Sequence, residues 1–347
     1  MSEAAARPAP GAAPSTAVGR LVVSIVAWKG AELTIACLRS IEPELDSVPG
    51  MRVIVVDNAS PDGAADRVEQ AIAQNGWGGW ATLMRAPGNH GFASGNNIAI
   101  RAMLAQAQPA EYVLLLNPDT LVRPGALRLL LDFVAARPTV GIAGGRSEDF
   151  DATPQMCCFR FPNAINELLC YLGLSVLDRL FQRHLTRLGI PQEPRVVDWV
   201  SGAFMLIRKA VIDDIGLMDE GYFLYFEETD FARRAQQAGW GCWHVPQSRV
   251  VHFVGQSSGV TVRDQPPRRV PSYWFESRRR YFVLNHGRRY AALTDMLVIV
   301  AYPLGRLRHW LQRKPARSPP HFFGDFVRHS AIVKRETPES LARRVCT

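Results

Sequence analysis

The sequence predicts an α/β fold in which a mostly parallel sheet is flanked by helices. Short apolar runs alternate with stretches of helical periodicity through the first half of the 347-residue chain. The central runs are apolar throughout, which is typical of strands buried on both faces. Two of the runs end in carboxylate and amide side chains. Since parallel sheets bind ligands at the carboxyl ends of their strands, we expect the functional site at that edge.

The expected elements follow one another in a regular order. Ser60 and Pro61 suit the N-cap and first position of the second helix, and the third helix is expected to begin near Ser94. Strands are expected at Leu21–Ala27, Arg52–Val56, Trp80–Met84, Tyr112–Leu116 and Val140–Gly144. Helices are expected between them at Ala31–Ile41, Pro61–Gln74, 94–107 and Pro124–Ala136.

The fourth strand ends in the most informative stretch, Asn117-Pro118-Asp119. Pro118 stops the strand because it has no N–H to donate to a neighbour. Asp119 is therefore expected at the carboxyl edge, where its carboxylate and the Asn117 oxygen suit a hard divalent cation that carries phosphates. Taken alone, the stretch is equally typical of a turn in which Asp119 caps the next helix.

Two further features are expected at the same edge. The second strand is followed by Asp57-Asn58, and the loop PGNHGFASGNN occupies Pro87–Asn97. Its glycines let the backbone approach a ligand closely, and the next helix can receive negative charge at its N-terminus. A long strand-to-helix turn is the plainer interpretation. The sequence has no GxGxxG after the first strand and no GxxxxGK[ST], so the dinucleotide fingerprint and the P-loop are both absent.

The second half of the chain begins with an amphipathic stretch, Asn166–Leu188, predicted to be a helix. Its arginines at every fourth residue, Arg179, Arg183 and Arg187, are expected on one face. A packed helix with a solvated basic stripe and a helix lying on a membrane both fit this pattern. Val197–Arg208 is expected to be another buried strand.

Three carboxylates, Glu227, Glu228 and Asp230, cluster at the start of a helix that is expected to end near Gly239. Charge complementarity with the helix dipole is the plainer explanation. The neighbouring aromatic residues make the surroundings partly apolar, so a carboxylate there could act as a general base. His252, at the end of a short strand, is a candidate additional metal ligand, although a lone histidine is more often structural.

Composition excludes several classes of protein. The six cysteines show no CxxC pair or finger spacing, which argues against a zinc module and a disulfide scaffold and fits a reducing compartment. Residues 1–19 have the composition of a disordered leader and lack the apolar core of a signal peptide. The apolar stretch Met296–Leu304 is shorter than the roughly 20 residues that span a bilayer, so no transmembrane helix is expected.

The net charge of +8 is concentrated in an arginine-rich C-terminal region with interleaved aromatic residues. An anionic membrane surface is favoured over a plain solvated helix face, and nucleic acid is disfavoured. The arginines and lysine considered are Arg268, Arg269, Arg278, Arg279, Arg280, Arg288, Arg289, Arg306, Arg308, Arg313, Lys314 and Arg317.

Seven blocks in order resemble the inverting glycosyltransferases of family 2, and among these the bacterial rhamnosyltransferase-like enzymes. The blocks are VVSIVAW, VIVVDNAS, GNHGFASGNN, LLLNPDT, WVSGAFMLIR, GLMDEGYFLYFEETDFARRAQQAGW and VVHFVGQSSG. They cover about Leu21–Gly259. The resemblance implies a GT-A fold, in which a mostly parallel nucleotide-binding sheet flanked by helices is merged with an acceptor-binding half, here followed by a helical C-terminal extension.

The resemblance also implies roles for individual residues. Asp119, with His252 as an additional ligand, would bind a divalent cation, Mg²⁺ or Mn²⁺. Glu228 would be the catalytic base, with Glu227 or Asp230 as alternatives. Two departures bear on these roles, because Asn117 replaces the first Asp of the family's Asp-x-Asp motif and Glu228 replaces the usual Asp. Donor-binding residues would be Ala27, Trp28, Asp57, Asn58, Gly91, Phe92, Asn96, Asn97, Asn117 and Asp119. Acceptor-binding residues would be Trp199, Gly202, Ala203 and Glu227.

The implied protein is an inverting transferase that moves a sugar, with rhamnose the first guess, from a nucleotide-diphosphate donor to a glycan or a polyprenyl-diphosphate-linked acceptor in cell-envelope polysaccharide synthesis. It would be cytoplasmic and peripheral on the inner face of the membrane. The expected domains are a leader (1–19), a transferase domain (20–262, divided into donor half 20–145 and acceptor half 146–262) and a basic extension (263–347). Alternatives are a metal-dependent phosphotransferase or nucleotidyltransferase and a non-catalytic sugar-nucleotide-binding relic.

Overall fold

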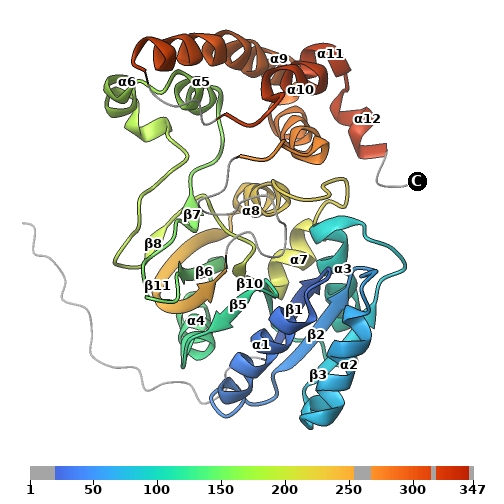
Figure 1. Cartoon of the computed structure of the whole chain (residues 1–347). Coiled ribbons are helices and arrows are strands. Elements are labelled where there is room, and N and C mark those ends of the chain that lie inside the picture. The colour runs from blue at the N-terminus through green and yellow to red at the C-terminus, as the bar shows by residue number, and fades with distance from the viewer. Residues whose placement is uncertain (1–19, 254–266, 314–317, 344–347) are drawn as a thin grey trace, which may run out of the picture.

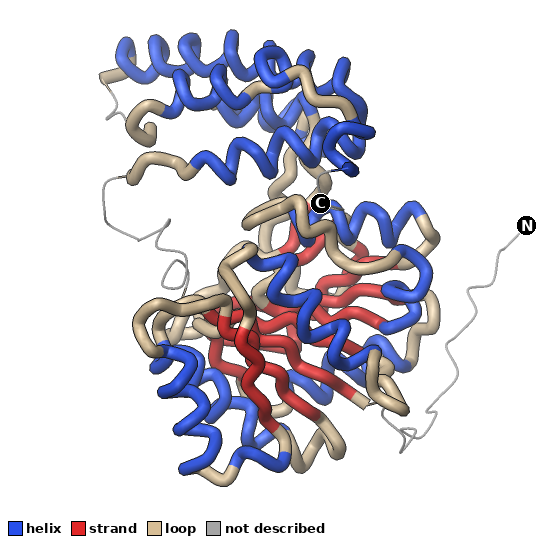
Figure 2. The backbone as a smooth tube through the Cα atoms, turned by 90° about the vertical axis from the view of Figure 1, so that its right-hand side faces the viewer, coloured by secondary structure: helices blue, strands red, loops and turns tan. Residues whose placement is uncertain are grey.

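The computed structural model describes residues 20–253, 267–313 and 318–343. Its centre is one sheet with the strand order β3-β2-β1-β4-β10-β6-β11-β5, and β8 pairs with β11. Helices cover both faces of this sheet, and the C-terminal helices form a separate layer above it (Figures 1 and 2). The predicted leader, Lys314, Arg317 and the expected boundary at 262/263 lie outside the described residues.

The first half follows the predicted alternation closely. β1 (Leu21–Ala27), β2 (Arg52–Asp57), β3 (Ala81–Arg85) and β4 (Tyr112–Leu116) pair in parallel. α1 (Ala31–Ile41), α2 (Ala64–Gln74), α3 (Gly91–Leu104) and α4 (Ala126–Ala135) connect the strands of this half. Val23 and Ile25 belong to the core cluster under one face of the sheet and Val22 to the cluster under the other, so the strands are buried on both faces as predicted.

The second half contributes strands of both directions. β10 (Phe204–Arg208) runs antiparallel between β4 and β6 (Val140–Glu148), and β11 (Gly241–His252) runs parallel to β6. β5 (Thr120–Val122), which was not predicted, pairs antiparallel with β11. The remaining short elements are β7 (Cys158–Phe159), β8 (Arg195–Val196), β9 (Trp199–Val200), α7 (Lys209–Ile215) and α8 (Glu227–Gln237).

The predicted start of α2 is wrong. The helix begins after Gly63, which is in the left-handed region at φ 73°, and not at Pro61. The Ser60 hydroxyl accepts a hydrogen bond from the Lys29 N–H, and the Ser60 N–H donates to Asp57. Ser60 therefore ties two loops of the carboxyl edge together and does not cap the helix.

The predicted single helix at Asn166–Leu188 is also wrong. α5 (Ala164–Leu172) ends at Gly173, whose φ of 62° stops the helix, and α6 (Ser175–Leu180) follows as a separate short helix. A turn at Gln182–His184 comes next. Arg179, Arg183 and Arg187 therefore do not share one helical face.

The C-terminal extension is helical, as predicted. α9 (Ser272–Leu311) is 40 residues long and kinks at Gly287, and α10 (Phe322–His329), α11 (Ala331–Lys334) and α12 (Pro338–Arg343) pack around it. By length and composition α9 could cross a membrane, although the sequence had suggested too short an apolar stretch. Arg278, Arg279 and Arg280 are buried and paired with carboxylates of neighbouring segments. These three arginines hold the helical layer together and are not available to a partner surface.

Candidate functional site

A cleft of about 670 Å³ opens at the carboxyl edge of the sheet. This volume lies within the roughly 300–1,000 Å³ that is typical of ligand pockets. Predicted residues from several parts of the chain meet in it, including the turn after β4, the start of α3, the start of α8 and the end of β11. The predicted residues that line the cleft are Trp28, Asn58, Gly91, Phe92, Asn117, Asp119, Gly202, Ala203, Glu227, Glu228 and His252.

Asp119 and His252 approach each other because β5, which begins one residue after Asp119, pairs with the end of β11. Thr120 on β5 is paired with His252, and the Phe253 N–H donates to the Asp119 carbonyl at 3.0 Å. This pairing brings His252 Nε2 within 3.5 Å of Asp119 Oδ1. The Asn117 amide lies 3.4 Å from the same imidazole nitrogen. The three side chains therefore present nitrogen and oxygen atoms to one point of the cleft.

This donor set fits part of a cation's coordination sphere. Adjacent ligands of an octahedral ion with bonds of about 2.1 Å lie roughly 3 Å apart, close to the 3.5 Å between Asp119 and His252. Within the described ranges, no group of three or more His, Cys, Asp or Glu side chains could hold a metal ion. A cation here would need further ligands from a bound molecule or from water.

The start of α3 packs against the aromatic loop that precedes α8. The Phe92 N–H donates to the Phe223 carbonyl at 2.8 Å, and the Asn58 side-chain amide donates to the Gly91 carbonyl at 2.9 Å. Gly91 has a φ of 90°, and a Cβ at this position would lie 1.9 Å from the Phe223 carbonyl oxygen. Gly91 is therefore required for the close contact between the two halves of the cleft.

Replacing Gly91 with alanine is expected to disrupt this contact. The strained φ and the overlap with Phe223 should together lower the free energy of unfolding by at least about 2 kcal/mol. The thermal midpoint of Gly91→Ala should fall clearly. Gly79→Ala is the matched control, since a Cβ there meets no atom within 4 Å. Equal thermal midpoints for the two variants would show that the start of α3 does not make this close contact with Phe223.

Several predicted donor residues lie behind the cleft wall. Asn96 is hydrogen-bonded to Ser24 and Phe92, and Asn97 to Met218 and Glu220. Both amides are buried and hold α3 in place. Asp57 accepts from the Ser60 N–H, and neither it nor Ala27 is among the residues that line the cleft.

The acidic cluster divides into two parts. Glu227 and Glu228 line the cleft, and one carboxylate oxygen of each is buried with no hydrogen-bond partner among the described residues. Asp230 instead forms an ion pair with Arg234 at 2.9 Å and accepts from the Asn285 amide at 2.8 Å. It fastens α8 to α9 and does not face the cleft.

The start of α8 is conformationally strained. Tyr225 and Phe226 both have a φ of 70°, in the left-handed region that non-glycine residues rarely adopt. Such residues cost about 1–3 kcal/mol each and are often found at functional sites. The unusual turn brings Glu227 and Glu228 into the cleft at the first turn of the helix.

Burial raises the pKa of both cleft carboxyl groups. The pKa of Glu228 rises to about 7 because its carboxylate is desolvated, although backbone N–H groups near Gly202 and Thr229 partly oppose this. The pKa of Glu227 lies well above its usual range, because of desolvation and of repulsion from Glu228. Desolvation therefore favours the neutral form of Glu227, while Glu228 can exchange a proton near neutral pH.

The sequence predicted aromatic residues beside the acidic cluster, but it did not identify Tyr273, which completes an aromatic wall of the cleft. Phe223, Tyr225 and Tyr273 line it, and the Tyr273 ring lies 5.1 Å from Phe223 and 6.3 Å from Tyr225. Tyr273 comes from α9, far along the chain. The only signal for it in the sequence is its position among other aromatic residues. Trp199, a predicted acceptor residue, instead stacks on Phe159 at 4.3 Å outside the lining of the cleft.

Comparison with known proteins gives a consistent picture. A family model described as glycosyltransferase like family 2 matches residues 19–281. The chain is 28% identical over 219 residues to the N-acetylglucosaminyl-diphospho-decaprenol L-rhamnosyltransferase of Mycobacterium tuberculosis, covering 60% of this chain and 68% of that protein. It is 28% identical over 175 residues to the rhamnosyltransferase WbbL of Escherichia coli, covering 48% and 62%.

Solved structures with a similar fold are also glycosyltransferases. The mannosyltransferase PcManGT from Pyrobaculum calidifontis, in complex with GDP-Man and Mn²⁺, superposes with a TM-score of 0.53 at 17% identity, covering 95% of this chain and 86% of that one. GalNAc-T7 with UDP, GalNAc and Mn²⁺ gives a TM-score of 0.54 at 14% identity, covering 96% and 57%.

Proposed function

Because the chain belongs to glycosyltransferase family 2 and has its GT-A fold, we propose that it transfers rhamnose from a nucleotide-diphosphate donor to a hydroxyl group of a lipid-linked glycan. The main support for the proposal is that Asp119, His252 and Glu228 line the same cleft. The rhamnosyltransferase relatives support the choice of sugar, and the name of the M. tuberculosis relative supports a polyprenyl-diphosphate-linked acceptor.

In this proposal the β4 edge binds the donor. Asn58, Gly91 and the Asn117–Asp119 turn lie along one wall of the cleft, and Asp57 supports that wall from behind. Asp119 and His252 would hold Mg²⁺ or Mn²⁺ together with the donor diphosphate. The cation would neutralise charge that builds up on the departing nucleoside diphosphate. Asn117 contributes an amide where a second carboxylate would bind more tightly.

The opposite wall would receive the acceptor. Glu228 lies beside Gly202, and its ionised carboxylate would take the proton of the acceptor hydroxyl as that oxygen attacks the anomeric carbon. The bond to the nucleoside diphosphate breaks on the other face, so the configuration at that carbon is inverted. Glu227, whose pKa is raised by desolvation and by repulsion from Glu228, would in its neutral form donate a hydrogen bond to the acceptor.

The division of the chain follows from these roles. Residues 20–145 would form the donor half and 146–262 the acceptor half, and the extension from 263 would complete the site through Tyr273. The protein would work in the cytoplasm at the inner face of the membrane, where a lipid-linked acceptor is anchored.

A panel of nucleotide sugars tests this proposal. dTDP-rhamnose, UDP-glucose, UDP-galactose and GDP-mannose are each incubated with Mn²⁺ and an N-acetylglucosaminyl-diphospho-polyprenol acceptor, and the glycolipid product is analysed by mass spectrometry. We expect transfer from dTDP-rhamnose. Nucleotide binding without product from any donor would favour the non-catalytic relic, which the Asn117 substitution supports. Phosphoryl or nucleotidyl transfer to the acceptor would favour the other alternative.

The rate of transfer should depend on pH through Glu228. A base must be ionised to act, and the pKa of Glu228 is raised to about 7. We therefore expect kcat to rise about tenfold per pH unit below 7 and to level off above it. The measurement is kcat between pH 5 and 9 at saturating donor. A flat profile through this range, in an enzyme that stays folded, would contradict the role of Glu228.

A further inference from the structure

The second half of α9 carries a long exposed apolar face. The residues recur at helical spacing over about five turns, and each is at least 50% exposed. They are Leu293, Met296, Val300, Leu304, Leu307 and Leu311. Together with the exposed Trp310 they form what we call the α9 stripe.

The opposite face of the same helix is fixed to the body of the protein. Asp295 accepts from Arg278 and from the Ala331 N–H, both at 2.6 Å. Val298 and Ala301 are buried, and Gly305 lies against the Tyr171 carbonyl, where a Cβ would have no room. The helix therefore lies along the protein, and the stripe is the face that has no covering among the described residues.

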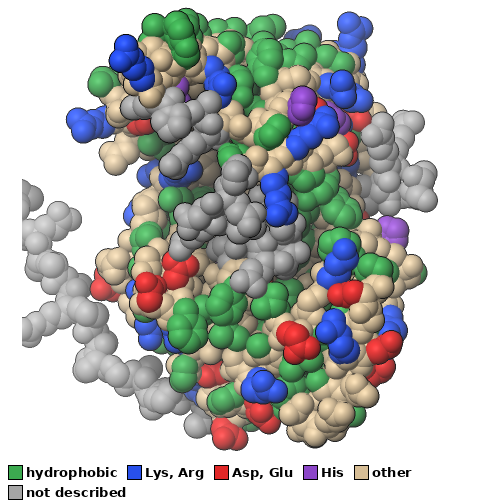
Figure 3. Space-filling model, viewed as in Figure 1, with side chains coloured by type: hydrophobic (Ala, Val, Ile, Leu, Met, Phe, Trp, Pro, Cys, Tyr) green, Lys and Arg blue, Asp and Glu red, His purple; other side chains and the backbone are tan. Residues whose placement is uncertain are grey.

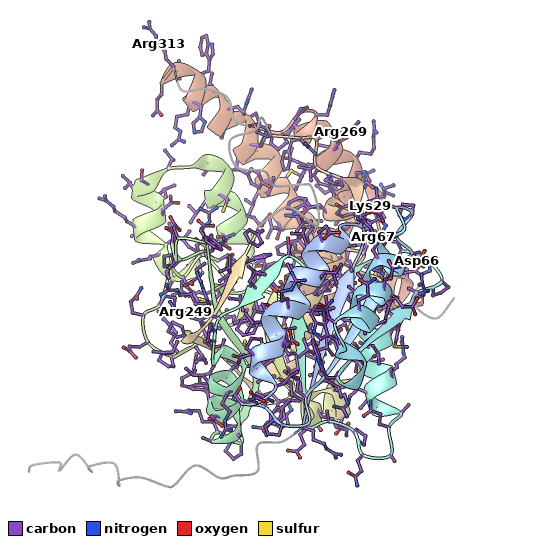
Figure 4. The ribbon with its side chains drawn as sticks, turned by 60° about the horizontal axis from the view of Figure 1, so that its bottom comes forward. Lys29, Asp66, Arg67, Arg249, Arg269 and Arg313 are labelled. Atoms are coloured by element: carbon purple, nitrogen blue, oxygen red, sulfur yellow. The ribbon has the colours of Figure 1, made fainter. Side chains whose placement is uncertain are left out.

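The exposed charges that α9 itself places beside the stripe are basic. Between residues 288 and 313, a stretch described throughout, Asp295 is the one carboxylate, and it is buried. Four arginines in the same stretch are exposed: Arg288, Arg289, Arg306 and Arg313. Arg313 lies at the far tip of the helix, away from the sheet (Figure 4).

A groove of about 470 Å³ marks the N-terminal end of the stripe. Leu293, Met296 and Ile332 line its apolar part, and Arg288 and Arg335 line it as well. Two guanidinium groups beside an apolar floor suit a phosphate group attached to an acyl chain. At the other end, Arg308 donates to the Gly173 carbonyl and so holds the start of α6, where Val176 and Leu180 are more than 70% exposed.

We propose that the α9 stripe, with the Arg288–Arg335 groove and the exposed residues of α6, docks the protein onto an anionic lipid bilayer. Hydrophobic side chains gather along the upper edge of the molecule in Figure 3, with Lys and Arg side chains at its ends. An apolar helical face with a basic rim is the pattern of helices that lie in the bilayer interface. A second copy of the chain is a poorer occupant, since it would bring the exposed arginines of α9 against those of the other copy, and residues 288–313 offer no exposed carboxylate to offset them.

This inference deepens the proposed function by giving the lipid-linked acceptor a surface from which to reach the cleft. Its test is independent of catalysis. The full-length protein is floated with vesicles of phosphatidylcholine alone and of phosphatidylcholine with phosphatidylglycerol, without donor or acceptor. We expect binding to the anionic vesicles, weakened by salt. Absence of binding to anionic vesicles would overturn the inference even if transfer from dTDP-rhamnose is observed.

Paired variants locate the surface. Leu307→Glu with Leu311→Glu should lower the affinity for anionic vesicles at least tenfold, because two anchoring side chains are lost. The control pair is Phe150→Glu with Val196→Glu, which makes the same charge change at exposed apolar residues of the sheet domain. Equal losses in both pairs would overturn the assignment to α9.

The basic groove is tested in the same way. Arg288→Gln with Arg335→Gln should weaken binding about fivefold per arginine, whereas Arg39→Gln with Arg52→Gln, exposed arginines of α1 and β2, should change it little. Light scattering gives the oligomeric state of each variant. A dimer of the wild type that the Leu307→Glu, Leu311→Glu pair dissociates would assign the stripe to a second copy and overturn the membrane surface.

Discussion

Replacing Glu228 with glutamine is expected to lower kcat about 10²–10⁴-fold while the KM for the donor changes little. The amide keeps the shape of the side chain and its place beside Gly202, but it cannot accept the proton of the acceptor hydroxyl. The loss should therefore fall on the chemical step. Steady-state kinetics with saturating acceptor measure both constants.

Glu227→Gln is the matched control for this variant. Desolvation and repulsion from Glu228 raise the pKa of Glu227 well above its usual range and so favour its neutral form, which an amide replaces with another neutral hydrogen-bonding group. The loss of kcat should be much smaller than in Glu228→Gln. If the two effects are reversed, Glu227 is the base and the assignment to Glu228 is wrong.

Thermal unfolding separates loss of chemistry from loss of structure. A carboxyl group whose pKa is raised on folding stabilises the protein at low pH, and that contribution is lost as the pH rises through the folded-state pKa. For Glu228 the loss occurs between about pH 4.5 and pH 7. Glu228→Gln removes it, so at pH 8 the variant should unfold at the same temperature as the wild type or a higher one.

Replacing Asp119 with alanine is expected to abolish the effect of Mn²⁺ on donor binding and to lower kcat/KM about 10²–10³-fold. Asp119 is almost completely buried and lies 3.5 Å from His252, so the variant removes the carboxylate that is proposed to bind the cation. Titration of the donor nucleotide with and without Mn²⁺ measures the effect. Metal-dependent binding that persists in Asp119→Ala would place the cation elsewhere.

Asn117→Asp provides the complementary variant. A second carboxylate at the end of β4 adds charge next to His252, whose Nε2 lies 3.4 Å from the Asn117 amide. The affinity for Mn²⁺ in the presence of donor should rise. This variant keeps the backbone of the turn, so a gain would support the edge as the metal site without relying on a loss of function.

The sheet and the carboxyl edge were predictable because they depend on local patterns. The apolar runs of β1, β2 and β4 are typical of buried strands, and Pro118 shows where a strand must end because it has no N–H to donate. The start of α2 was mispredicted because Ser60 bonds across the edge to Lys29, a contact between residues that are distant in sequence. The break between α5 and α6 at Gly173 was not predicted, because leucines continue to recur at helical spacing on both sides of it.

The site was predicted less completely than the fold. Asp119 and His252 follow or end apolar runs, and Glu228 lies in an acidic cluster at the start of a helix, so local sequence patterns could identify all three. The structure brings them to one cleft. Tyr273 could not be predicted, because its place depends on how α9 returns over the sheet domain. The basic character predicted for Arg278, Arg279 and Arg280 was misleading for the same reason, since composition does not show that Arg278, for example, is paired with Glu167 and Asp295.

The most direct test of the account measures nucleoside diphosphate release and donor binding side by side in the wild type, Asp119→Ala and Glu228→Gln, as Mn²⁺ is titrated. We predict release that requires the metal in the wild type and is lost in both variants. Metal-dependent donor binding should be lost in Asp119→Ala alone. Release at the wild-type rate by Glu228→Gln, or release by the wild type that is independent of metal, would contradict the account.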